Sequence, residues 1–151
     1  MDRLSGAWDA AETEAFLDSA TVPLRLSCHA NGESLWMLSL WFLYQDEAFW
    51  CATSANADVV DYLADNDRVA FEVSTNEPPY KGVRGNGTAT VEPDSEKALL
   101  RELLERYLGG TDSDLADRLL SPERDEVTIQ IDPNRLYTWD FTDRMADVTP
   151  E

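Results

Sequence analysis

Few side chains in this sequence have the types and spacing that side-chain catalysis requires. The single histidine, His29, stands beside an Asn-Gly turn, and no serine or cysteine nucleophile motif accompanies it. No His/Cys pattern has metal-ligand spacing. The Asp-Asn-Asp run at 65–67 lacks the glycine and distal glutamate of a calcium loop, and the Gly-Asn-Gly run at 85–87 leads into strand-like residues rather than a helix. A bound cofactor that carries the chemistry is therefore the better hypothesis for an enzyme.

The best candidate for a ligand surface is the aromatic stretch 35–53, which holds three of the five tryptophans. Its first strand, 35–44, is apolar on both faces, with Leu38 pointing one way and Met37 and Trp41 the other. Such a strand has both faces covered, as in a barrel wall that packs a core inside and a partner or ligand outside. The stretch indicates a site for a planar ligand, a dimer interface, or both.

Hydrophobic periodicity predicts a mainly β protein with short helices (α+β) that would position this stretch. Asp9 is expected to cap the first helix, and Asp58 or Asn56 the second. Asp-Pro-Asn at 132–134 is expected to bend the chain. The predicted helices are 10–19, 59–64, 96–108 and 113–120, and the predicted strands are 22–28, 35–44, 48–53, 68–73, 80–91, 126–131 and 136–141.

Length and composition favour one domain over residues 1–151, with terminal extensions at about 1–8 and 142–151. No apolar run approaches the roughly 20 residues of a membrane span, and the chain does not open with a signal peptide. Cys28 and Cys51 lie in apolar strand patterns and are expected to be buried thiols. We therefore expect a cytoplasmic protein with no membrane association.

The charge balance is extreme, since 30 acidic residues face 12 basic ones, for a net charge of −18. Nucleic-acid binding requires a basic face and is disfavoured. The aromatic content argues against disorder. We interpret the acidity as a halophilic adaptation to molar salt, because at ~1 M salt the Debye length falls to about 3 Å and carboxylates scarcely repel one another.

The order of these elements, and of short segments along them, resembles the pyridoxamine 5′-phosphate oxidase-like family over nearly the whole chain. The segments are 23–26, 39–44, 50–54, 66–73, 80–87 and 138–141. The resemblance implies a split β-barrel of six to seven antiparallel strands. It also implies a homodimer that binds one flavin mononucleotide (FMN) per chain between subunits, and some related barrels use a deazaflavin coenzyme instead.

The resemblance further implies a set of cofactor-binding residues, while catalytic residues remain unknown and no metal is expected. These residues are Leu38, Ser39, Leu40, Trp41, Trp50, Ala52, Thr53, Ser54, Asn56, Val59, Lys81, Val83, Arg84 and Trp139. Many family members carry a Ser-Arg-Lys run that grips the phosphate, whereas residues 54–58 here contain no cation. The phosphate would then need Lys81 and Arg84, or Arg25, with the amides that begin the second helix.

Three functions follow from this departure. The first is a flavin-dependent oxidoreductase of unknown substrate, with a deazaflavin reductase as its variant. The second is a flavin-binding or storage protein without turnover, and the third is a cofactor-free dimeric interaction module. Oxidation of pyridoxamine phosphate itself is not expected, because the sequence shows no basic residues for a second phosphate.

Overall fold

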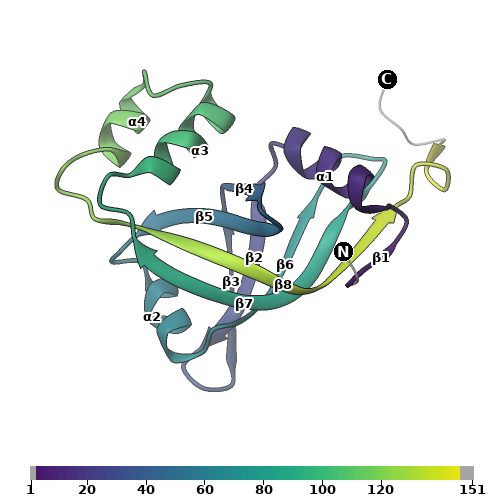
Figure 1. The fold of residues 1–151 in the computed structure, drawn as a ribbon, viewed down its shortest axis with the longest axis horizontal. Helices are drawn as coiled ribbons and strands as arrows, with labels where there is room; N and C mark the ends of the chain where they lie inside the picture. Colours follow the sequence, from purple (N-terminus) through teal and green to yellow (C-terminus); the bar gives the residue numbers. More distant parts are fainter. Residues whose placement is uncertain (1–2, 147–151) are drawn as a thin grey trace.

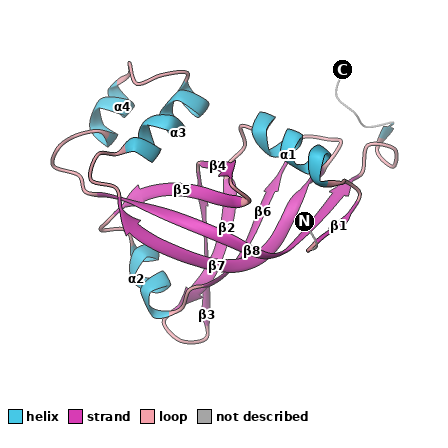
Figure 2. Cartoon of the chain, in the orientation of Figure 1, coloured by secondary structure: helices cyan, strands magenta, loops and turns pink. Residues whose placement is uncertain are grey.

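The computed structural model describes residues 3–146 and arranges them as one curved sheet with helices around it (Figure 1, Figure 2). The elements in chain order are β1 (Leu4–Gly6), α1 (Ala10–Ser19), β2 (Leu24–Ala30), β3 (Ser34–Leu40), β4 (Phe42–Gln45), β5 (Ala48–Ser54), α2 (Asp58–Asp65), β6 (Arg68–Ser74), β7 (Lys81–Pro93), α3 (Ala98–Leu108), α4 (Asp114–Leu119) and β8 (Glu126–Asp140). No helix in this range is both long and apolar enough to cross a membrane.

The strands form an eight-stranded sheet in the order β3-β2-β6-β7-β8-β5-β4, with β1 pairing parallel to β8. β3 and β4 lie at opposite ends of this path, yet only Trp41 separates them in the chain. The chain itself therefore closes the sheet into a barrel that is split along this seam. The predicted α+β split barrel is confirmed, with eight strands in place of the predicted six to seven. β1 joins the sheet and Trp41 divides one predicted strand in two, while the predicted strands 126–131 and 136–141 are joined in β8.

The two strands predicted on either side of residues 132–134 are one continuous strand, because β8 runs through Pro133. The predicted bend coincides with a bulge in β8, since Asn86 and Gly87 of β7 pair with Arg135 and Pro133 and leave Asn134 as the extra residue. A Cβ on Gly87 would lie 2.2 Å from the carbonyl oxygen of Asp132, so a glycine there allows the two backbones to approach. The long, strongly curved β8 is the common neighbour of β1, β5 and β7.

The barrel core consists of the inward-facing residues of alternating strands. Leu24, Leu26 and Cys28 of β2 pack with Phe42 and Phe49, and all five are almost fully buried. Alternation along β2 leaves Arg25 and Ser27 on the outer face. The core thus determines which side chains reach the outside of the sheet.

A capping side chain begins α1 but not α2. Asp9 caps α1 in a reciprocal capping box with Glu12, as predicted. The prediction for α2 is wrong, since its N-cap is Ala57, whose methyl group cannot accept a hydrogen bond from the backbone. Asp58 lies inside the first turn. In Figure 1, α3 and α4 lie together beside the end of β5, where Trp41 stacks on Tyr107 of α3 at 5.1 Å between ring centroids.

Candidate functional site

A groove of about 740 Å³ lies on the outer face of the sheet across β2, β6, β7 and β8. Strand register builds its floor from one cross-strand row, because residues directly opposite each other project from the same face. The row runs Arg25, Glu72, Arg84 and Tyr137, and it continues beyond the groove to Ser39 of β3.

The groove concentrates the scarce positive charge of the chain. Arg3, Arg25, Arg84 and Arg135 line it, whereas Glu72 is the one acidic residue among its lining residues in the range 3–146. Glu72 accepts a hydrogen bond of 2.9 Å from the Ser74 hydroxyl. Four arginines against one carboxylate, in a chain with 30 acidic residues, make this a cationic groove on an otherwise acidic molecule. Electrostatics of this kind attract an anionic ligand.

Arg25 is the most informative member of this cationic groove. Its Nη2 donates to Asn76 Oδ1 at 2.8 Å. Its Nη1 is buried and has no hydrogen-bond partner in the described part of the chain. An unsatisfied buried donor on a charged group is costly, and an anionic acceptor in the groove would relieve that cost.

Arg84 is held above two aromatic rings. Its guanidinium carbon lies 4.8 Å from the ring centre of Tyr137 and 5.0 Å from that of Trp139. These cation–π contacts orient the side chain but leave its N–H groups free to meet an anion. Arg3 is anchored differently, because its Nη1 donates to the carbonyl oxygen of Pro133.

The predicted site residues separate into three groups. In the first, Arg84 lines this groove, and Ser39, Trp139 and Lys81 lie outside its lining. Ser39 pairs with Arg25 across β2 and β3, and Trp139 contacts Arg84. Lys81 lies at the end of β7 opposite Asp140. Burial raises the pKa of Asp140, but hydrogen bonds from Thr142 and Trp8 and the charge of Lys81 outweigh it and leave that pKa below its usual value. The Lys81 charge is therefore balanced locally.

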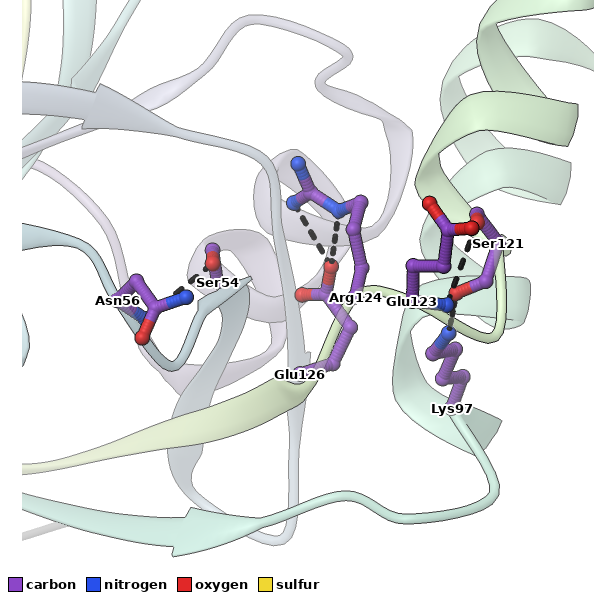
Figure 3. Close-up of polar contacts among 7 residues, drawn as sticks. All are labelled: Ser54, Asn56, Lys97, Ser121, Glu123, Arg124 and Glu126. Atoms are coloured by element: carbon purple, nitrogen blue, oxygen red, sulfur yellow. Dashed lines mark hydrogen bonds and ion pairs between the residues drawn. The ribbon is translucent and has the colours of Figure 1, made fainter.

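The second group lies at the end of β5, where the resemblance places the phosphate. The backbone N–H of Asn56 donates to Ser54 Oγ at 3.2 Å (Figure 3). Asp58 and Asp61 occupy the first turn of α2 that follows, so their charges oppose an anion at the helix start. Thr53, the remaining member, precedes Ser54 on β5.

The two nearby cations are already engaged, as Figure 3 shows. Arg124 forms an ion pair of 2.8 Å with the buried carboxylate of Glu126, and the ammonium of Lys97 donates to the carbonyl oxygen of Ser121. A small cavity beside them is also lined by Asp94 and by further carboxylates. In the described part of one chain, both cations near the end of β5 are therefore engaged by the protein itself.

The third group packs inside the protein. Val59 and Val83 belong to the buried core, and Leu38 and Leu40 pack against it. The remaining members lie on or near β5: Trp41 and Ala52 pack against the cluster formed by α3 and α4, and Trp50 Nε1 donates to the carbonyl oxygen of Gln45 at 3.0 Å. Cys28 and Cys51 are buried, as predicted.

One chain does not bring the first two groups together. Thr53 pairs with Val127, which pairs with Pro93 of β7. Residues 84 to 93 lie on the same strand, so at ~3.3 Å per residue roughly 30 Å of curved strand separates Arg84 from the level of the β5 end. A site that used both groups would need a second copy of the chain.

A strip of exposed apolar residues borders the cationic groove. Leu35, Trp36 and Met37 of β3 are 68%, 48% and 65% exposed, and Tyr137 on the groove floor is 42% exposed. Because its sequence is apolar on both faces, this strand is expected to have both faces covered. In one chain its outer face is open, which is the condition expected of an interface.

Sequence reasoning missed Arg3, Asn86, Arg135 and Tyr137 as groove residues. A signal was present, because Arg25 and Arg84 occupy outward positions of alternating strands in a chain with only 12 cations. Using that signal requires the register between β2, β6 and β7, which local patterns do not provide.

Comparisons with known proteins agree on the fold. Rv2991, a conserved hypothetical protein of Mycobacterium tuberculosis, matches with 22% identity over 89% of this chain and 86% of that one, with a TM-score of 0.73. An F420 reductase matches with 21% identity over 86% and 98%, TM-score 0.66. A FAD-binding protein of Mesorhizobium loti matches with 20% identity over 85% and 90%, TM-score 0.60.

No curated protein is significantly similar to this chain in sequence. The family model described as pyridoxamine 5′-phosphate oxidase, however, matches residues 9–138. This match runs from the cap of α1 to the last residues of β8, so it includes the barrel and most of the groove. The chain therefore belongs to the pyridoxamine 5′-phosphate oxidase family.

Proposed function

We propose that this protein binds a flavin-type redox cofactor, with FMN as the first choice, and acts as an oxidoreductase. The observation that carries the proposal is the unpartnered, buried Nη1 of Arg25 in a groove lined by four arginines. Family membership supports it, as do structural neighbours described as an F420 reductase and as FAD-binding proteins. The substrate remains unknown.

The residues of the cationic groove fit a phosphate-bearing aromatic cofactor. Arg25 and Arg84 would hold the phosphate through charge-assisted hydrogen bonds. Tyr137 and Met37 offer apolar surface beside them. When bound, the flavin would supply hydride or electron transfer, while the protein binds it, orients it and excludes water.

A homodimer with the cofactor at its interface is part of this proposal. A second copy would cover the exposed strip of β3, at Leu35 to Met37. It is also the means by which the β5 end of one subunit, with Thr53 and Ser54, would approach the cationic groove of the other. In such a dimer, Arg25 and Arg84 would bind the phosphate in place of residues 54–58, which include no cation.

The test is the visible spectrum of protein purified in molar KCl, before and after addition of FMN. A flavin band in the purified protein, or a shifted and quenched band on addition, is the expected result. Bleaching of the band by a nicotinamide cofactor distinguishes an oxidoreductase from a flavin-binding or storage protein. The same titration with a deazaflavin coenzyme tests the variant.

A colourless, folded protein that takes up neither cofactor would contradict the proposal and favour a cofactor-free dimeric module. Near-ultraviolet circular dichroism in the same buffer shows whether the protein is folded. It therefore separates loss of binding from loss of structure.

A further inference from the structure

A second compartment continues the cationic groove along the outer face of the sheet. It has a volume of about 330 Å³ and shares Ser27, Ala70, Asn86 and Asn134 with the groove. The two cavities therefore form one trench that runs along β2 and β6. The second compartment is lined by residues that the proposed function does not use.

This second compartment also carries positive charge, which Arg68 supplies. His29 lines it as well, and none of its lining residues among those described is acidic. The Arg68 side chain is exposed, while its backbone N–H donates to Asn66 Oδ1 at 3.1 Å. The amide side chains of Asn86 and Asn134 add neutral donors at the junction of the two cavities. Guanidinium and amide donors without a competing carboxylate suit a carboxylate or a phosphate.

Strand geometry sets the spacing between the two cationic positions. Arg25 and His29 are four residues apart on β2, and Arg68 lies four residues from Glu72, which faces Arg25. Both intervals correspond to about 13 Å at ~3.3 Å per residue. A compact monoanion therefore reaches only one of the two positions.

We propose that the trench is a single site for ligands with two anionic groups, carboxylate or phosphate, about 13 Å apart. The first position, at Arg25 and Arg84, is the phosphate position of the proposed function, on which this inference rests. The second position, at Arg68 and His29, holds either the far end of the same cofactor or the anionic group of a separate substrate.

Calorimetric titration of the cofactor-free protein with glutamate peptides of one to five residues tests the spacing. It is done at the lowest KCl concentration that preserves the near-ultraviolet dichroism. An extended residue spans roughly 3.3–3.6 Å, so four residues cover the interval. We expect affinity to rise at least about tenfold between two and four residues, since a second charge-assisted contact then forms.

Substitutions show which residues are responsible for the higher affinity of the longer peptides. Arg68→Gln is expected to remove the rise in affinity with peptide length and to leave the affinity for the dipeptide unchanged. Arg25→Gln is expected to lower the affinity for every peptide. Arg118→Gln, on α4 and outside the trench, is the matched control. Affinity that is independent of length, or a length dependence that survives Arg68→Gln, overturns the inference, as does the absence of any peptide binding.

The FMN-loaded protein distinguishes the two sources of the second anion. Diglutamate that binds beside FMN and is lost with Arg68→Gln supports a separate substrate position. Competition between FMN and only the longer peptides supports one extended ligand. If FMN fails to bind while the length dependence persists, the proposed function fails and this inference stands.

Discussion

At the scale of single residues, the few cations of this chain are placed where specific acceptors lie. The clearest case is Arg106 of α3, whose guanidinium donates to the carbonyl oxygens of Leu17, Asp18 and Ala20 at the end of α1. It also lies over the Phe42 ring. α1 has no basic residue in its own last turn, so a distant helix supplies the positive charge that its C-terminus favours.

Arg106→Gln is expected to lower the free energy of unfolding by about 2 kcal/mol, because hydrogen bonds from a charged donor to these carbonyls are lost. Urea unfolding in molar KCl measures the change without altering ionic strength. Arg101→Gln, an exposed position on the same helix, is the control and is expected to change little. Equal midpoints for the two variants would contradict the role assigned to Arg106.

Cys51 makes stability depend on pH in the alkaline range. Burial raises the pKa of its thiol from 9.0 to about 12. Above pH 9 the unfolded thiol ionises while the folded one stays protonated, so the unfolded state binds fewer protons and stability falls as pH rises, by up to ~1.4 kcal/mol per pH unit. Burial of Tyr44 raises its pKa to about 12 and adds to the loss above pH 10.

Urea midpoints measured from pH 8 to 11 test this pH dependence. Cys51→Ala is expected to be less stable at pH 8, because it leaves a small cavity, but to show a shallower alkaline decline. A decline as steep as that of the unmodified protein would show that Cys51 is not its source.

At the scale of elements, sequence patterns predicted most helices and strands because one face of each packs on a common core. Alternation in β2 and β6 and the Asp9 cap were sufficient for this. Local patterns did not predict the features that depend on pairing between strands far apart in the sequence. Pro133 lies within one continuous β8, which takes up a bulge at Asn134 opposite Asn86 and Gly87 of β7. The cationic groove joins Arg25 to Arg84, 59 positions later.

The exposed strip of β3 yields a prediction at this scale. Met37→Lys is expected to convert a dimer into a monomer, because it places a charge in the surface that a second copy would cover. Sedimentation velocity in molar KCl measures the mass. Leu108→Lys, at an exposed apolar position on α3, is the control. Unchanged sedimentation of Met37→Lys would place any interface elsewhere.

At the scale of the whole molecule, the net charge of −18 makes the stability of the fold depend on salt. Self-repulsion destabilises the compact state at low salt, where the Debye length at 0.1 M is about 10 Å, and this repulsion is screened near 1 M. We expect the urea midpoint to rise steadily as KCl increases over this range. A midpoint that does not change with salt would remove the hypothesis of adaptation to molar salt.

The central claim is that the arginine groove holds the phosphate of a flavin, and a comparison of FMN with riboflavin tests it most directly. The two ligands differ only in the phosphate, so fluorescence quenching in the same KCl buffer isolates its contribution. We expect the protein to bind FMN at least about tenfold more tightly than riboflavin, with Arg25→Gln abolishing this preference. Equal affinities for the two ligands, or a preference unaffected by Arg25→Gln, would contradict the claim.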